Sequence, residues 1–297
     1  MSDKDLILVF IKMVIDKKFK GLVKEDFRYV FYGNIETTED LEIDLDMGLF
    51  VTGSIEAGWY IKADESIDAG ESIKAGGYIE AGESIEAGEF IEAGESIEAG
   101  GYIEAGEYIN AGWYVEAGEF IEAGEYINAG EYINAGRSID AGESIKAGEF
   151  IEAGESIEAG GYIEAGEYIN AGWYVEAGEF IEAGRYIKAG WSIDAGESIK
   201  AGGYIEAGGS SGIVAGLSIT CKGTLSFGLK AFAGICSWRE ISEEEKTITC
   251  EKFNGGVVEY GILKETGLEE DRKIELSMDE IAQKFGVAVK DLKIKKD

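Results

Sequence analysis

Carboxylates recur at every eighteenth position through the middle of this 297-residue chain. One series, which we name the acidic row, holds only Asp or Glu: Asp68, Glu86, Glu104, Glu122, Asp140, Glu158, Glu176 and Asp194. Carboxylates in a row can transfer protons, ligate a divalent cation or attract a basic surface. Which of these uses applies depends on the elements that position the row.

The composition argues against catalysis and against a specific metal site. The chain contains no His, so it lacks the commonest general base and the commonest metal ligand. We find no phosphate-binding loop, no nucleophile elbow, no zinc set and no Asp-rich calcium loop. Carboxylate pairs are so frequent that no single pair stands out as an acid and a base. We therefore expect a non-enzymatic protein with no catalytic residues, no metal and no cofactor.

The carboxylates belong to a six-residue repeat that predicts short strands. Large aliphatic residues recur every six positions from Ile55 to Ile205, which makes 26 consecutive hexads, with Val115 and Val175 as substitutes. Ala follows two residues after each aliphatic, and Gly follows that Ala in every hexad except at Asp64. A period of six fits neither an α-helix nor a coiled coil. In a strand, however, the aliphatic and the Ala share one face, and Gly permits a tight corner.

Three such strands and their corners make an 18-residue coil, so the sequence predicts a triangular β-helix whose handedness stays open. Coils of this kind stack at about 4.8 Å. Residues one coil apart then lie above one another on one of three faces, which we name after Ile55, Ile61 and Ile67. The acidic row lies on the Ile67 face. The Ile55 and Ile61 faces mix Glu with Asn and Lys at the same position of the hexad.

The ends of the chain differ from the repeat. Residues 3–32 are amphipathic and predict one or two helices, so we expect residues 1–42 to form a helical N-terminal cap. The β-helix should span residues 43–234, with a two-residue slip at "GGSSG". Residues 235–297 should form a small α+β domain, with strands in "TITCEKF" and "GVVEYGILKE" and a helix in "SMDEIAQKFG".

The hexads, as in Ile85-Glu86-Ala87-Gly88, resemble those of hexapeptide-repeat β-helix proteins. In the left-handed acyltransferases of that group the small residue precedes the aliphatic by two positions and a His is catalytic, and this chain shares neither feature. The chain is loosely similar to bactofilins, and this resemblance implies a polymer-forming structural protein. By analogy it also resembles acidic pentapeptide-repeat proteins that imitate DNA, which implies binding to a DNA-binding protein.

The negative charge is concentrated in the repeat. Residues 55–208 contain 33 acidic and 7 basic side chains, whereas the whole chain has a formal net charge of -32. The 26 hexads should form a rod of about 42 Å, with one net negative charge per roughly 1.6 Å. Duplex DNA carries one per about 1.7 Å of its axis. The same carboxylates would also serve to keep a long β-surface soluble.

Aromatic residues form a second series, on the Ile61 face, in the position before the aliphatic. Candidate contact residues in this series are Tyr114, Tyr132, Tyr168 and Tyr186. Stacked aromatics stabilise sheets, and this structural role is the simpler interpretation. An exposed Tyr-rich surface would also suit contact with another protein.

Two hypotheses follow for the function. The first is a nucleic-acid mimic that binds and inhibits a basic DNA- or RNA-binding protein, as a phage anti-defence protein directed at restriction or CRISPR would do. The alternative is a structural or assembly protein, either a bactofilin-like filament or a phage component, with the β-helix as a rigid spacer. In either case we expect no direct binding of nucleic acid and no membrane association, and the terminal domains could supply a homodimer contact.

The predicted location is the cytoplasm, or the host cytoplasm for a phage protein. The apolar segment Leu6–Ile15 lacks a preceding basic run and a cleavage site, and it is too short to span a bilayer. The three cysteines, Cys221, Cys236 and Cys250, form no Cys-x-x-Cys pair. We expect them to be reduced and to pack as small apolar side chains.

Overall fold

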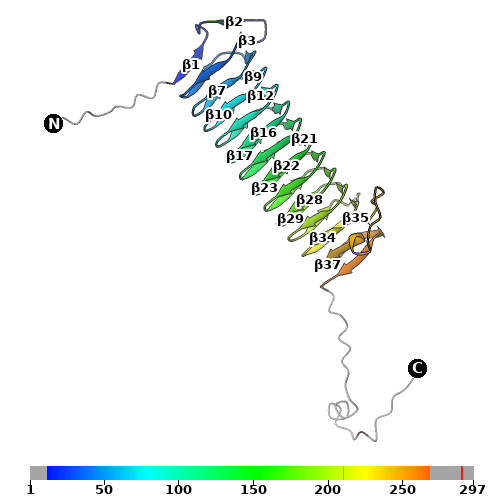
Figure 1. Ribbon diagram of the computed structural model, residues 1–297. Helices are drawn as coiled ribbons and strands as arrows, with labels where there is room; N and C mark the ends of the chain where they lie inside the picture. Colours follow the sequence, from blue (N-terminus) through cyan, green and yellow to red (C-terminus); the bar gives the residue numbers. More distant parts are fainter. Residues whose placement is uncertain (1–11, 210, 268–288, 290–297) are drawn as a thin grey trace, which may run out of the picture.

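The computed structural model describes residues 12–209, 211–267 and 289, and it shows a parallel β-solenoid. Figure 1 shows a straight stack of coils, with β1 (Met13–Asp16) at one end of the stack and β37 (Lys252–Tyr260) at the other. Each regular coil holds three strands, because each strand of the hexad repeat pairs in parallel with the strand three hexads further along the chain, as Ile55 does with Ile73. This pairing confirms the predicted coil length. The solenoid has 13 turns, counted along its 13-stranded sheet.

The Ile55 face is that 13-stranded sheet. Its strands are β4 (Ile35–Thr37), β7 (Ile55–Ala57), β10 (Ile73–Ala75), β13 (Ile91–Ala93), β16 (Tyr108–Ala111), β19 (Tyr126–Ala129), β22 (Ser144–Ala147), β25 (Ile163–Ala165), β28 (Ile181–Ala183), β31 (Ile199–Ala201), β34 (Ile219–Cys221), β36 (Thr247–Cys250) and β38 (Ile262–Glu265).

The Ile61 face follows each of these strands by one corner. Its strands are β1 (Met13–Asp16), β5 (Leu41–Asp44), β8 (Ile61–Ala63), β11 (Ile79–Ala81), β14 (Ile97–Ala99), β17 (Tyr114–Ala117), β20 (Tyr132–Ala135), β23 (Phe150–Ala153), β26 (Tyr168–Ala171), β29 (Tyr186–Ala189) and β32 (Ile205–Ala207). The face continues into the first half of the long strand β35 (Thr224–Ala233), which pairs with β32 and with β37 (Lys252–Tyr260).

The Ile67 face carries the acidic row. Its strands are β3 (Tyr29–Phe31), β6 (Leu49–Val51), β9 (Ile67–Ala69), β12 (Ile85–Ala87), β15 (Ile103–Ala105), β18 (Phe120–Ala123), β21 (Ser138–Ala141), β24 (Ile157–Ala159), β27 (Val175–Ala177), β30 (Ile193–Ala195), β33 (Ile213–Ala215) and the second half of β35. The expected slip is confirmed, because Ile193 pairs with Ile213, two positions beyond the regular spacing.

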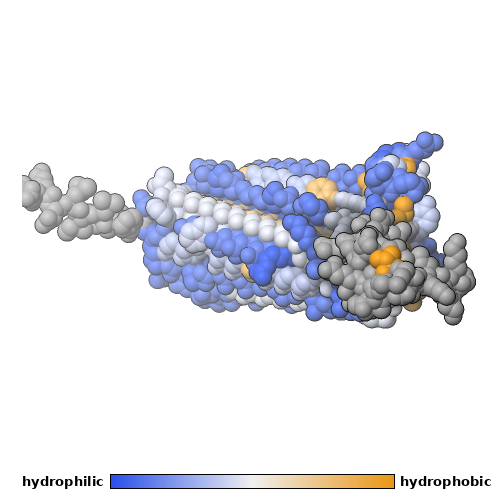
Figure 2. Space-filling view, turned by 90° about the horizontal axis from the view of Figure 1, so that it is seen from below, coloured by the Kyte–Doolittle hydropathy of each residue, from blue (hydrophilic) through white to orange (hydrophobic). Residues whose placement is uncertain are grey.

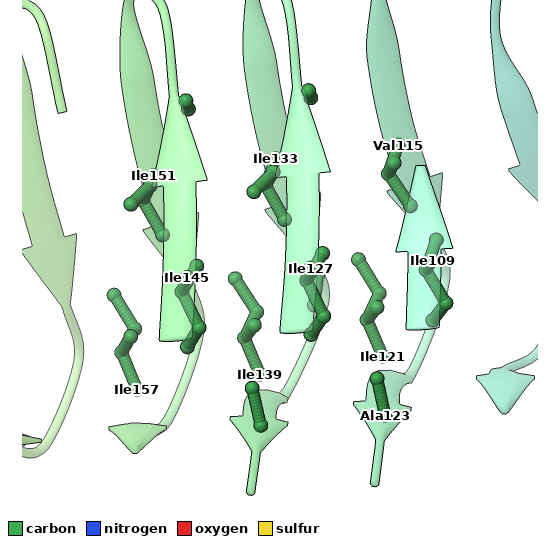
Figure 3. Close-up of a cluster of buried hydrophobic side chains, with 14 of the residues drawn as sticks. Ile109, Val115, Ile121, Ala123, Ile127, Ile133, Ile139, Ile145, Ile151 and Ile157 are labelled. Atoms are coloured by element: carbon green, nitrogen blue, oxygen red, sulfur yellow. The ribbon is translucent and has the colours of Figure 1, made fainter. Parts of the chain in front are cut away.

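The core is the inside of the solenoid and consists of the Ile and Ala of the hexads. Every hexad aliphatic from Ile55 to Ile205 is fully buried, and each Ala is at most 7% exposed. Figure 3 shows the side chains of Ile127, Ile133 and Ile139 in one layer and equivalent residues in the next. The alternation that predicted strands therefore also fills the interior without polar groups.

The glycine of each hexad is needed for a reason other than the one expected. Among the described residues, positive φ angles occur only at Gly21, Gly33, Gly234, Gly255 and Gly261, all outside the hexads. In the hexads the limit is the distance between coils: a Cβ on Gly130 would lie 2.0 Å from the carbonyl oxygen of Gly112 in the preceding coil. A side chain there would push two coils apart.

The predicted helical N-terminal cap is wrong for the residues that the structure describes. Residues 12–42 contain β1, β3, β4, the start of β5 and the short strand β2 (Leu22–Lys24), and they contain no helix. Strands form here in place of the predicted helices, because their backbones can hydrogen-bond to the neighbouring strands and their apolar side chains can pack inside the solenoid. The N–H of Met13 donates to the carbonyl oxygen of Asp40 at 2.7 Å, and Ile15 is fully buried. Residues 3–11 of the expected helix lie outside the described part.

At the other end, the predicted strands form, and they stack on the solenoid. β36 pairs in parallel with β34 and then with β38, while β37 pairs with β35. The 3-10 turn η1 (Glu244–Lys246) leads into β36. Both sheets therefore continue beyond residue 234. The helix expected in residues 277–286 lies outside the described residues.

Candidate protein-binding surface

The eight carboxylates of the acidic row lie side by side on adjacent strands, as predicted. Successive members are direct partners in the parallel register, from Asp68 with Glu86 to Glu176 with Asp194. The row ends at Phe50, which is the partner of Asp68, and at Val214, which is the partner of Asp194. The repeat thus builds one uninterrupted line of like charges along the rod.

A second line of carboxylates, which we name the corner row, follows the Ile67 face at its next corner. Its members are Glu71, Glu89, Glu107, Glu125, Glu143, Glu179 and Glu197, with Gly161 in the gap. The backbones at this corner stack directly, since the N–H of Glu89 donates to the carbonyl oxygen of Glu71 at 2.8 Å and the pattern repeats up the rod. The acidic row and the corner row together make a two-row acidic surface.

All seven basic residues of the repeat pair with carboxylates elsewhere. Each lies within salt-bridge distance of the Glu at the equivalent position of a neighbouring coil: Lys62–Glu80, Lys74–Glu92, Arg137–Glu155, Lys146–Glu164, Arg185–Glu167, Lys188–Glu206 and Lys200–Glu182. None of these pairs includes a member of the acidic row or of the corner row. The acidic row and the corner row therefore contain no cation of the repeat, whereas the other 18 carboxylates of the repeat share their surfaces with all 7 cations.

One cation from outside the repeat reaches the acidic row. The β2–β3 hairpin places Arg28 with its Nη1 3.6 Å from Oδ2 of Asp68, and its guanidinium lies 4.2 Å from the centre of the Phe50 ring. Asp68 is therefore paired, and the other seven members of the row have no salt bridge among the described residues. Sequence reasoning missed this pair because Arg28 lies far before Asp68 in the chain, in a segment without a repeat.

The charges of the acidic row repel one another. Burial, followed by the charge of Glu86, raises the pKa of the Asp68 carboxyl to about 6, although Arg28 opposes the rise. The pKa values of Glu104, Asp140 and Asp194 are also raised, first by desolvation and then by the flanking carboxylates of the row. A partner that supplied positive charge here would relieve this repulsion.

The aromatic series also forms, but away from the acidic row. Tyr114, Tyr132, Phe150, Tyr168, Tyr186 and Tyr204 stack ring on ring at 4.8–4.9 Å on the Ile61 face. The hydroxyl groups of Tyr114, Tyr132 and Tyr168 donate to glutamates of that same face at 3.2–3.4 Å. Burial, followed by the charge of Glu152, raises the pKa of Tyr168 to about 12. These tyrosines therefore stabilise the Ile61 face, which is a different face from the one that carries the acidic row.

Other chemistry has little support in the described residues. No group of three or more Cys, Asp or Glu side chains there is arranged to hold a metal ion. The three cysteines are free, and Cys221 and Cys250 are buried. Burial raises the pKa of the Cys221 thiol to about 12, which keeps it protonated and unreactive. In the same part of the chain, no helix has the length and apolar character needed to cross a membrane.

The class that the fold and the surface define is a parallel β-solenoid whose acidic row and corner row contain no cation of the repeat. Figure 2 shows hydrophilic side chains in bands along the rod, with few apolar residues on the side in view. No family model, no curated protein and no solved structure matches this chain significantly.

Proposed function

We propose that this protein is a non-enzymatic acidic rod that binds the nucleic-acid-contacting surface of a basic DNA- or RNA-binding protein and thereby inhibits it. The observation that carries the proposal is the segregation of charge. Every cation of the repeat is paired with a Glu that belongs to neither row, and the acidic row and the corner row contain no repeat cation. A surface that served only solubility would gain nothing from such an arrangement, since like charges on adjacent strands destabilise the fold.

The spacing of the charges supports a nucleic-acid mimic over a general acidic surface. Rings that stack at 4.8–4.9 Å follow the coil repeat, so the acidic row carries one carboxylate about every 4.8 Å over eight coils. A groove lined with Lys and Arg meets a regular line of phosphates when it binds nucleic acid. A rigid line of carboxylates presents the same sign of charge at a comparable density, which favours fast encounter with basic surfaces.

A nuclease-treated pull-down from host lysate at low salt, followed by a salt gradient, tests the proposal. We expect one DNA- or RNA-binding protein to be released below about 0.5 M salt, because electrostatic attraction is screened at that ionic strength. Competition by duplex DNA or RNA for the captured protein should displace the rod. Recovery of no such protein would reject the mimicry hypothesis.

A matched pair of variants locates the binding surface. Changing Glu86, Glu104, Glu122 and Glu158 to Gln neutralises half of the acidic row. Changing Glu56, Glu98, Glu116 and Glu152 to Gln removes the same charge from the other two faces. We expect the first variant to lose binding to the partner and the second to retain it. Both variants should show a cooperative thermal unfolding transition, which would confirm that they are folded. Equal loss in both variants would show that binding depends on net charge alone.

A structural or assembly role is the second candidate, and the C-terminal end of the solenoid favours it. β37 and β38 end the two sheets among the described strands, and Val257, Tyr260 and Ile262 are exposed there. An uncovered sheet end can pair with another chain. Light scattering over a concentration range in about 0.5 M salt separates the two candidates, because a spacer protein would form filaments or larger oligomers that survive salt.

A further inference from the structure

The hairpin at the N-terminal end of the rod forms one wall of an open cavity against the acidic row. β2 and β3 pair antiparallel, and the N–H of Glu25 donates to the carbonyl oxygen of Arg28 at 2.9 Å to close the tip. Figure 1 shows this hairpin extending to one side of the first coils. Between its tip and the Ile67 face lies a half-open cavity of about 200 Å³.

The lining of the cavity combines aromatic rings with carboxylates. Phe27, Phe50 and Tyr102 supply the rings, and Asp68, Glu83 and Glu86 supply the carboxylates. The hydroxyl of Tyr102 donates to Glu86 at 3.2 Å and that of Ser66 donates to Glu83 at 3.2 Å, so these carboxylates are held in place. With Arg28 as the one cation in the wall, three carboxylates leave the cavity with an excess of negative charge.

Two further observations indicate what the cavity would bind. Arg28 already shows how a guanidinium sits at this end of the row, since it stacks over Phe50 and lies beside Asp68. Phe27, next to it at the tip, is 90% exposed and contributes nothing to the core. An exposed ring beside carboxylates is the combination that favours a planar cation, because the ring face attracts the charge and the carboxylates accept the N–H groups.

We propose that this cavity is an arginine-binding pocket, in which a guanidinium of the partner lies between Phe27 and the carboxylates of Glu83 and Glu86. The identity of the partner rests on the proposed function, but the pocket can be tested without that partner. The pocket would fix the position of the partner along the rod. One arginine of the partner binds at the first coils, and the acidic row attracts the rest of the partner's basic surface.

The test is titration of the full chain with a blocked tetra-arginine peptide and with a blocked tetra-lysine peptide at low salt. Both peptides carry the same charge, so the acidic row attracts both, but only the guanidinium is planar and stacks well on a ring. We expect the wild type to bind tetra-arginine about 2–5-fold more tightly than tetra-lysine. Phe27→Ala should abolish that preference while leaving tetra-lysine affinity unchanged, and it should not alter folding because the side chain is exposed.

Glu86→Gln and Glu98→Gln form the matched pair. Each glutamate accepts a hydrogen bond from a tyrosine hydroxyl of the next coil, Glu86 from Tyr102 and Glu98 from Tyr114, but only Glu86 lines the cavity. We expect Glu86→Gln to weaken tetra-arginine binding about 2–5-fold and Glu98→Gln to leave it unchanged.

Three outcomes would overturn the pocket: no binding of tetra-arginine, equal affinity for both peptides in the wild type, or a preference that Phe27→Ala leaves intact. A wild type that shows the preference but captures no nucleic-acid-binding protein from lysate would reject the proposed function and keep the pocket. The two ideas therefore fail separately.

Discussion

At the scale of single residues, the carboxylates of the acidic row repel one another, and this repulsion depends on pH. Asp68 is half-buried and its pKa is raised to about 6, while the pKa values of Glu104, Asp140 and Asp194 are raised in the same direction. A raised carboxyl pKa means that the folded chain binds the proton more tightly than the unfolded chain does. Charging these groups above their folded-state pKa values therefore costs stability, and protonating them restores it.

We expect the melting temperature to rise as the pH falls from about 7.5 to about 5, because Asp68, whose folded-state pKa is about 6, takes up a proton across that window and the raised pKa values of the other three carboxyls act in the same direction. The triple variant Glu104→Gln, Asp140→Asn and Asp194→Asn should be more stable than the wild type at pH 7.5 and should show a smaller rise. Thermal melts followed by circular dichroism at several pH values measure both effects.

The control removes the same number of charges from the Ile61 face, with Glu98, Glu116 and Glu152 changed to Gln. Its pH dependence should match that of the wild type, because the raised groups are still present. A melting temperature that falls steadily as the pH is lowered in the wild type would contradict the repulsion that we assign to the acidic row.

At the scale of strands and coils, the glycine of each hexad sets how closely two coils approach. Gly130→Ala should destabilise the protein by about 1–3 kcal/mol, the usual cost of forcing extra atoms into a packed interior. The new Cβ would meet the carbonyl oxygen of Gly112, which belongs to the backbone and cannot rotate away. Unfolding in guanidinium chloride measures the loss.

Glu131→Ala is the control for that substitution, since Glu131 is the exposed neighbour at the same corner. We expect it to change the free energy of unfolding by less than about 0.5 kcal/mol. If Gly130→Ala changed the free energy of unfolding as little as Glu131→Ala, the coils could move apart more easily than their hydrogen bonds suggest, and the proposed role of Gly130 would be wrong.

The coils were predictable from the sequence because their signal is local and repeated. Ile-x-Ala alternation gives a strand, and three hexads per coil are enough to place Asp68 beside Glu86. The ion pairs between neighbouring coils could have been found in the same way, since Lys146 and Glu164 are also separated by three hexads. The true role of Gly was not predictable, because it depends on the distance between coils.

The structure of the N-terminal segment was predicted wrongly as helical because its sequence contains no repeat. Residues 12–32 are amphipathic and fit a helix locally, but tertiary pairing overrides that preference when β1 and β3 find parallel partners in β5 and β6. The contact between Arg28 and Asp68 follows from that pairing and from the hairpin, so the candidate arginine pocket had no signal in the sequence. Local sequence patterns do not predict elements whose formation depends on partners far away in the chain.

At the scale of the whole molecule, the hexads are interchangeable for folding but not for the surface. Deleting residues 137–142 removes one hexad with one Arg and one Asp, so the net charge is unchanged. Every downstream aliphatic still meets an aliphatic in the next coil, so the solenoid should fold. However, three members of the acidic row, Glu158, Glu176 and Asp194, move to the Ile61 face, and Lys146 and Lys200 enter the Ile67 face.

Deleting residues 137–154 instead removes a full coil and keeps every other residue on its face. This deletion removes a net charge of about −2, from two cations and four carboxylates, and shortens the acidic row only by Asp140. If the partner recognises the row, the single-hexad deletion should weaken binding roughly tenfold or more while the full-coil deletion has a smaller effect. If net charge alone decides, the order reverses, because only the longer deletion makes the rod less acidic. Measuring the partner's Kd for both variants, with circular dichroism to confirm folding, therefore distinguishes a patterned surface from a charged one.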